Sequence, residues 1–505
     1  MVEKCLKTSS GVKKKFLFAV ILLDILAIGM IPLNLFLIQM PEYISFIISI
    51  FVILSNILLW IKNKSNKVTK IILSLVSIIV ILCSLFGTYC NPYWNSLTFR
   101  KNANTMLKDD NMVLTKEDAL ADFDYAMKYL WKLHPALYHN TPEEIENRYT
   151  IARKNIENRE NIDVCTLHQE IESVFSQLHD AHTHADACYN NYHYLKYTYE
   201  HNQTGSVLRK INGVSLEDLF ENNSHLISFE SQDYGMVEIY DHISSLEGLK
   251  YLGISIEDGI EYTYEDENGS EEIYVFTKED FVTYDEYIAF NNINIDTTSE
   301  EDDPFVYYEI DVKNDIAILT LDACINNDEY KDCLNKMFSE IKENGIHNVA
   351  VDLRNNHGGN SSVANEFFKY INIDTYKTWA GIWRLGIFQI KSDTAILENE
   401  QYTNLVFDGN LYILTSVSTF SAAMDFAMLI KDNHLGTIIG EASGNDPSSY
   451  GDISYFTLPH SGIYMQISTK KWYRIDESLE HQLIEPDVPC DAEEAIECLY
   501  DEIKK

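Results

Sequence analysis

Three apolar runs fill the first 90 residues, and they constrain the fold of this chain more than any other feature. They are Phe16–Met40, Tyr43–Ile61 and Ile71–Tyr89, each 19–25 residues long. At 1.5 Å per helical residue, each run is long enough to cross the roughly 30 Å of hydrocarbon in a bilayer. A signal peptide or a buried core helix explains one such run. Three in succession, separated by short polar connectors, predict three transmembrane helices that bind the lipid bilayer.

The lysines around these runs predict their orientation. Lysines precede the first run and lie between the second and third, whereas the connector at 39–43 has neither Lys nor Arg. Because positive residues stay in the cytoplasm, the N-terminus is expected there. Everything beyond residue 91 is then expected outside, as the extracellular domain of a multi-pass protein of a bacterial cell membrane. Asp24 lies within the first run, where we interpret it as a tolerated or protonated polar residue.

The charge of the remaining chain excludes one class of partner. The whole chain has a formal net charge of −38, and its first 90 residues are basic, so the exported part is even more acidic. Such a surface repels phosphate backbones, which argues against nucleic-acid binding. A content of 46% hydrophobic and 12% aromatic residues supports large packed cores and argues against disorder.

The exported part divides into regions whose residue patterns predict different secondary structure. A polar linker at 92–114 precedes a small helical domain at 115–190, whose helices are expected from Thr115, from Pro142 to Glu160, and from Thr166. Residues 191–304 read as a β-rich middle segment with acidic turns, and 206–220 resembles a fragment of a PDZ module. From 305 to 505 strands alternate with helices, which predicts an α/β domain with a mostly parallel, buried sheet. The strands expected there are 316–321, 347–353, 411–415 and 436–441, with helices at 327–343 and 422–432.

Two loops follow strands of this predicted sheet, at the edge where α/β folds gather their chemistry. The loop at 351–362 contains Gly358 and Gly359, whose backbone N–H groups can approach a ligand closely and stabilise an oxyanion. The loop at 415–429 places Ser421 at the start of a helix. A serine there is either a plain N-cap or a nucleophile assisted by the helix N-terminus.

A third loop, at 178–185, carries His179, His182 and His184. Imidazole is the base that a serine nucleophile needs near neutral pH. The His-x-His spacing is also compatible with a metal, although no further ligand stands at a recognisable spacing, so no metal and no cofactor is expected. Seven cysteines lie beyond residue 89, and their exported location permits disulfides such as Cys490–Cys498.

Taken together, the motifs over about 116–495 resemble the C-terminal processing (tail-specific) serine peptidases, including the catalytic core of tricorn protease. VDLRNNHGG matches the family's Asp-Leu-Arg-x-Asn-x-Gly-Gly segment, and TFSAAMDFA matches its catalytic-serine segment. IIGEASGNDPSSYGD, FTLPHSGIYMQISTKK and IEPDV match later segments, while HPALY and LHDAHT match the helical domain. The resemblance implies a ClpP/crotonase-like catalytic sheet and cleavage of a protein or peptide substrate.

The resemblance also implies roles for particular residues. Ser421 would be the nucleophile and His182 of DAHT its base, because the stretch that carries the lysine of Ser–Lys members contains no lysine here and Lys431 stands elsewhere. Asp452, or alternatively Glu441, would orient the histidine. Gly358, Gly359 and Ala422 would form the oxyanion and substrate-binding loop.

The family pattern is not complete. Ala181 and Met424 replace the usual Gly and Glu, so the alternative is a catalytically weak peptide-binding or sensing module on the same scaffold. The oligomeric state and the natural substrate stay open.

Overall fold

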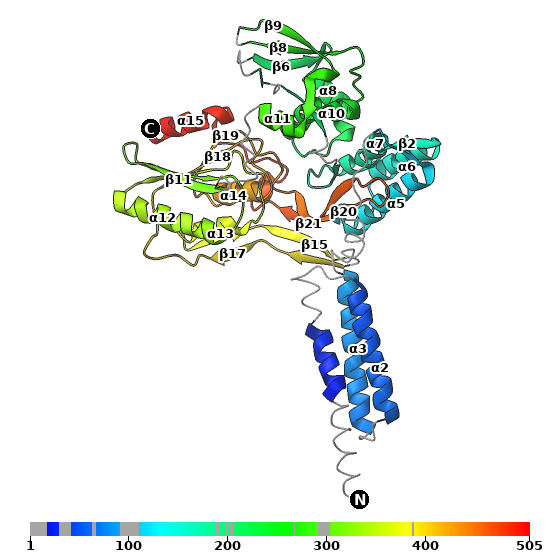
Figure 1. Cartoon of the computed structure of the whole chain (residues 1–505). Coiled ribbons are helices and arrows are strands. Elements are labelled where there is room, and N and C mark those ends of the chain that lie inside the picture. The colour runs from blue at the N-terminus through cyan, green and yellow to red at the C-terminus, as the bar shows by residue number, and fades with distance from the viewer. Residues whose placement is uncertain are drawn as a thin grey trace, which may run out of the picture.

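The computed structural model describes residues 18–29, 42–62, 67–90, 111–186, 192–196, 200–201, 206–266, 268–290, 304–385 and 388–505. The lysines before the first run, most of the linker at 92–114 and the acidic stretch at 300–303 lie outside these residues. Figure 1 shows a stalk of N-terminal helices that projects from a larger body built from the rest of the chain.

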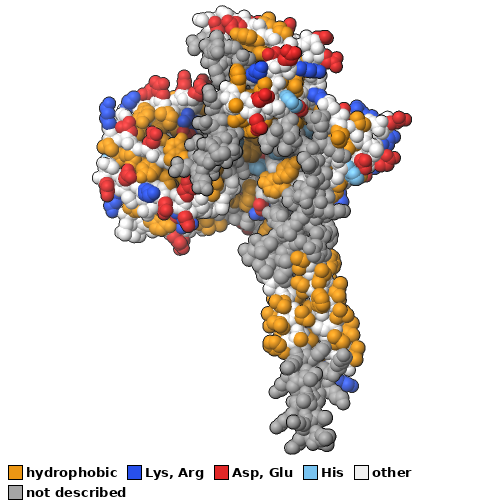
Figure 2. Space-filling model, viewed as in Figure 1, with side chains coloured by type: hydrophobic (Ala, Val, Ile, Leu, Met, Phe, Trp, Pro, Cys, Tyr) orange, Lys and Arg blue, Asp and Glu red, His pale blue; other side chains and the backbone are white. Residues whose placement is uncertain are grey.

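The stalk consists of helix 18–29, α2 (Glu42–Lys62) and α3 (Lys67–Cys90). Within the described residues one helix, over Lys67–Leu85, is long and apolar enough to cross a membrane, and Phe18–Gly29 and Phe46–Ile61 are shorter apolar helices. Their apolar side chains face outward, as the hydrophobic surface of the stalk in Figure 2 shows.

Polar contacts inside the stalk connect its three helices. Ser77 Oγ of α3 donates to the carboxylate of Asp24, with both oxygens at 2.9 Å, and accepts a hydrogen bond from Asn56 Nδ2 of α2 at 2.7 Å. Asp24 therefore links helix 18–29 to α3 by a hydrogen bond.

The helical domain contains three main helices: α5 (Lys116–Leu133), α6 (Glu143–Glu157) and α7 (Val164–Phe175). Thr115 caps α5 as the sequence predicts, since its hydroxyl accepts from Asp118 N at 3.2 Å. The start of α7 differs from the prediction. Asp163, and not Thr166, is the N-cap, because its carboxylate accepts the backbone N–H of Thr166 at 2.7 Å.

The middle segment is more helical than its sequence suggests. Its sheet is built on β6 (Ser206–Ile211), β8 (Ile260–Glu265) and β9 (Glu271–Phe276), with short β5 (Glu200–His201) and β7 (Val214–Ser215). Beside this sheet lie α8 (Leu216–Asn223), α9 (Gln232–Ile243), α10 (Leu246–Tyr251) and α11 (Tyr284–Phe290), and β4 (His193–Leu195) pairs with β10 (Phe281–Thr283). Serine hydroxyls cap the N-termini of α8, α9 and α10, a local signal that can start even short helices.

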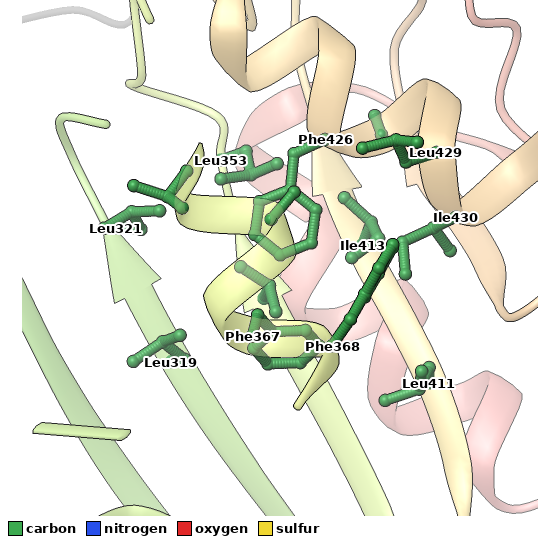
Figure 3. Close-up of a cluster of buried hydrophobic side chains, with 14 of the residues drawn as sticks. Leu319, Leu321, Leu353, Phe367, Phe368, Leu411, Ile413, Phe426, Leu429 and Ile430 are labelled. Carbon is green, nitrogen blue, oxygen red and sulfur yellow. The ribbon is translucent and has the colours of Figure 1, made fainter. Parts of the chain in front are cut away.

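The C-terminal domain confirms the predicted parallel sheet. Its strand order is β11-β12-β13-β18-β19-β22, parallel except for β11 (Val306–Asp311) at one edge. The parallel strands are β12 (Ile316–Leu321), β13 (Asn348–Asp352), β18 (Asn410–Thr415), β19 (Thr437–Gly440) and β22 (Val488–Pro489). The helices are α12 (Asp328–Asn344), α13 (Ser362–Phe368), α14 (Ala422–Asp432) and α15 (Ala495–Ile503). Figure 3 shows leucine, isoleucine and phenylalanine side chains from these strands, α13 and α14 filling one core.

A second, antiparallel sheet joins this domain to the helical domain. Its order is β16-β15-β21-β20, and β3 (His184–Asp186) of the helical domain pairs with β21. The other strands are β15 (Ala380–Leu385), β16 (Phe388–Ser392), β20 (Tyr450–Thr457) and β21 (Tyr464–Tyr473), while β14 (Thr375–Thr378) and β17 (Ala395–Glu398) form a separate pair. The strand pairing ties the histidine loop, which leads into β3, to the catalytic domain.

Candidate active site

Ser421 occupies a strained turn between β18 and α14. Its φ and ψ are 54° and −122°, a conformation that residues with a Cβ rarely adopt. Asn445 holds the turn, since its Oδ1 accepts the backbone N–H of Ser421 at 2.7 Å. The Ser421 hydroxyl makes no capping hydrogen bond to α14. The plain N-cap interpretation of this serine therefore has no support in its geometry.

The glycine loop after β13 lies directly against this turn. A Cβ on Gly358 would lie 2.6 Å from Ser421 Cβ, so the close approach requires glycine. Asn356 is fully buried and holds the loop, because it accepts from Gly358 N at 2.8 Å and its carbonyl accepts from Phe420 N at 3.0 Å. The N–H of Gly358 is thus already bonded. Among the hydrogen bonds between described residues, none uses the N–H of Gly359 or of Ala422 as donor.

His182 is held in a buried turn at the end of the helical domain. Its backbone N–H donates to Asp180 Oδ1 at 3.0 Å, and the next residue, Thr183, accepts from Ser468 N of β21 at 2.9 Å. The His182 ring lies 4.7 Å from the ring of Phe420, the residue before the serine. Neither ring nitrogen of His182 has a hydrogen-bond partner within the described part of the chain. The ring is therefore positioned by the backbone and by packing.

Asp180 is anchored on its other side by His134. His134 Nε2 lies 3.0 Å from Asp180 Oδ2, and both side chains are fully buried. His134 Nδ1 accepts from Ala136 N at 3.2 Å, so the proton of the neutral ring sits on Nε2 and is donated to Asp180. Burial alone would raise the pKa of Asp180, but the hydrogen bond from His134 opposes this effect, and the pKa is lowered to about 2. Asp180 therefore stays ionised beside His182.

A second carboxylate faces the same histidine, and no sequence motif indicates it. Glu230 comes from the middle segment, and its Oε1 lies 3.9 Å from His182 Nδ1, close to the 3.8 Å between that nitrogen and Asp180 Oδ1. Burial raises the pKa of Glu230 to about 7, against the opposing effect of His182. Burial would lower the pKa of His182, but Glu230 and Asp180 raise it above its usual value.

Ser421 and His182 open onto one cavity of about 490 Å³. Gly359, Asp425, Asp452, Lys470 and the rings of Trp379 and Trp472 also line this cavity. It lies beyond the carboxyl ends of β13 and β18, where the sequence predicts the chemistry.

The two acids proposed to orient His182 have other partners. Asp452 lines the cavity, but its carboxylate pairs with Lys470 Nζ at 2.6 Å. Glu441 accepts the backbone N–H groups of Val417 at 3.2 Å and Ala492 at 3.0 Å. Among the ion pairs of the described residues, neither acid comes within 4 Å of a His182 ring nitrogen. Lys431 pairs with Asp487 at 2.7 Å and does not line the cavity.

One group of described side chains could hold a metal ion. Asp180, His182 and Glu230 each offer a ligand atom, all within 4.8 Å of one another. His184, the other half of the His-x-His motif, is absent from this group, and its Nδ1 lies 2.9 Å from the carbonyl oxygen of Ala181. A metal on His182 Nδ1 would compete with its use as a base. Cys490 and Cys498, considered as a disulfide, are both free thiols here.

A strained serine and a buried histidine on one cavity, with two N–H groups on the glycine loop and the helix start, match what acyl transfer to serine requires. The fold and the site together define a serine peptidase.

Comparison with known families makes the assignment more specific. Residues 315–490 match the model of peptidase family S41. No curated protein matches the sequence significantly.

Two solved structures with TM-scores above 0.5 show the same fold at low sequence identity. Mature CPAF is 12% identical, with 77% of this chain and 96% of that chain covered and a TM-score of 0.55. Mature CPAF complexed with lactacystin is also 12% identical over the same shares, with a TM-score of 0.54. The photosystem II D1 C-terminal processing protease is 13% identical, covers 77% of this chain and 97% of its own, and has a TM-score of 0.41.

Proposed function

We propose that this protein is a membrane-anchored serine endopeptidase of the C-terminal processing type, with its catalytic domain outside the cytoplasm. The observation that carries the peptidase site is the shared cavity of Ser421 and His182. In this proposal Ser421 is the nucleophile, His182 is the base, and the N–H groups of Gly359 and Ala422 bind the oxyanion.

The reaction follows from this geometry. Ser421 Oγ forms a bond with the peptide carbonyl carbon while its proton moves to His182 Nε2. The negative charge that develops on the carbonyl oxygen is met by the two backbone N–H groups, supported by the N-terminal end of α14. His182 then gives the proton to the leaving amine as the C–N bond breaks. Water then attacks the acyl carbon while His182 takes its proton, and His182 returns a proton to Ser421 Oγ as the Oγ–C bond breaks.

The sequence predicts Asp452 or, alternatively, Glu441 as the carboxylate that orients His182, and of these two acids Asp452 lines the cavity. If Asp452 has this role, Asp452→Asn should lower kcat and leave KM unchanged, whereas Glu441→Gln should not. The opposite result would assign the role to Glu441. If neither change affects kcat, neither acid orients His182.

The membrane anchor is supported by three observations. Each of the three N-terminal runs forms an apolar helix within the described residues. Their apolar side chains are exposed, as expected for contact with lipid rather than with a protein core. Lysines flank the ends that the positive-inside rule places in the cytoplasm.

Two experiments test these parts separately. Full-length protein in detergent should hydrolyse fluorogenic peptides and react with a fluorophosphonate probe, and Ser421→Ala should abolish both. Folded protein that binds peptides without cleaving them would favour the sensing module instead.

Protease shaving of intact cells should remove the domain beyond residue 91, and protection until lysis would refute the outward orientation.

A further inference from the structure

The segment that carries Glu230 is docked on the catalytic loops. Ser231 Oγ donates to the carbonyl of Gly444 at 2.8 Å, and the ring of Tyr234 stacks on Phe420 with centroids 4.9 Å apart. Glu230 Oε2 accepts from Asp446 N at 2.9 Å. These contacts fix one oxygen of Glu230 to the loop that also positions the Ser421 backbone.

The other oxygen of Glu230 faces His182. Oε1 accepts weakly from Ala181 N at 3.4 Å and lies 3.9 Å from His182 Nδ1, and the Glu230 side chain is only 4% exposed. Asp180 is the nearest alternative, but its oxygens already accept from His134 and from the His182 backbone. Of the two carboxylates, Glu230 therefore has the oxygen that is less committed to strong hydrogen bonds.

We infer that Glu230 is a positioning residue for His182, so that the middle segment completes the catalytic site. A shortening of the Nδ1–Oε1 distance by about 1 Å makes a hydrogen bond, and catalytic hydrogen bonds commonly tighten when substrate binds. This inference rests on the proposed function of Ser421 and His182.

In this arrangement one proton moves from Ser421 to His182 and then to the leaving amine. His182 starts neutral with its proton on Nδ1, donated to the Glu230 carboxylate, so Nε2 is ready to accept from Ser421. When the Ser421 O–H bond breaks and the Oγ–C bond forms, the proton passes to Nε2 and His182 becomes a cation. The ionised form of Glu230, which predominates above its pKa of about 7, stabilises that cation until the proton leaves on the amine.

The charges around His182 predict a pH signature. The groups that face it are Asp180, Glu230 and Asp425, and each raises the pKa of His182 against the effect of burial. Removing the Glu230 charge lowers that pKa. The acid limb of the profile of kcat/KM against pH should then move to lower pH.

The test compares two variants of the full chain in detergent with fluorogenic peptide substrates. Glu230→Gln should lower kcat at least 100-fold, change KM less than 3-fold, and move the acid limb to lower pH. Asp233→Asn, an exposed acid at the start of α9, is the matched control and should leave kcat unchanged. A Glu230→Gln enzyme with kcat within 3-fold of the parent and an unshifted profile would overturn the inference.

Further measurements separate this inference from its competitors. If Glu230→Gln does not fold, Glu230→Asp keeps the charge and should retain measurable kcat with the parent's acid limb. A folded but inactive aspartate variant would overturn the inference. An active Ser421→Ala would instead refute the proposed function itself.

Metal analysis and chelation test the remaining possibility. If the parent protein contains bound metal, and chelation removes the metal and changes the activity, Glu230 belongs to a metal site instead.

Discussion

Gly358→Ala tests whether kcat depends on the close contact between the loop that contains Gly358 and the turn at Ser421. The added methyl would lie 2.6 Å from Ser421 Cβ and 2.9 Å from both Ala422 N and Phe420 O. These distances are shorter than van der Waals contact, and two of the three neighbours are backbone atoms, so the turn itself must move. Reaching ordinary contact requires about 1 Å, a misplacement that can cost about 100-fold in rate. The φ of +102° adds about 1–3 kcal/mol of backbone strain.

The assay is kcat for peptide hydrolysis together with urea denaturation. Gly345→Ala is the matched control, because Gly345 also has a positive φ, +67°, but has no atom within 4 Å of its added Cβ. Both variants should lose stability, whereas only Gly358→Ala should lose about two orders of magnitude in kcat. A Gly358→Ala enzyme with parental kcat would show that this contact does not hold Ser421 in place.

Three further outcomes follow from the structure. His134→Ala removes the anchor of the buried Asp180 carboxylate and should lower the free energy of unfolding by about 3–5 kcal/mol in urea titrations, and a loss below about 1 kcal/mol would contradict this. Burial lowers the pKa of His168 to about 4, so the unfolded chain binds the extra proton between the unfolded value of 6.5 and pH 4. Stability should therefore fall with decreasing pH in that window, by about 1.4 kcal/mol per pH unit for this group, and His168→Gln should flatten the slope measured by thermal melts. Lys431→Ala should keep its peptidase activity, because this lysine lies outside the cavity, and a 100-fold loss of kcat would favour a Ser–Lys mechanism.

The parallel sheet was predictable because its strands carry their own signal. β12, β13 and β18 are short apolar runs that are buried on both faces and end in polar loops. Such runs indicate a strand before any tertiary contact is known. The same loops place Ser421 and Gly359 at one edge of the sheet, so these two candidates could be found from strand ends alone.

Glu230 could not be found in this way. It is one of 77 acidic residues, in a segment with no recognisable motif, and it is buried by tertiary contacts that include the loop at 442–449. The helices of the middle segment were missed for a related reason, since single serine caps carry little information in isolation. Asp452 and Glu441 were plausible from position along the chain, but their partners, Lys470 and two backbone N–H groups, are tertiary.

The pairing of β3 with β21 has a consequence for how the enzyme is made. Thr183 and Ser468, which are bonded at this junction, are 285 positions apart in the chain. At synthesis rates of about 5–20 residues per second, the histidine loop waits roughly 15–60 s for the strand that holds it. Closing so long a loop is also slow in itself. The nascent protein therefore carries no assembled base and nucleophile while it is being synthesised, and its chain order alone delays proteolysis until the domain is complete.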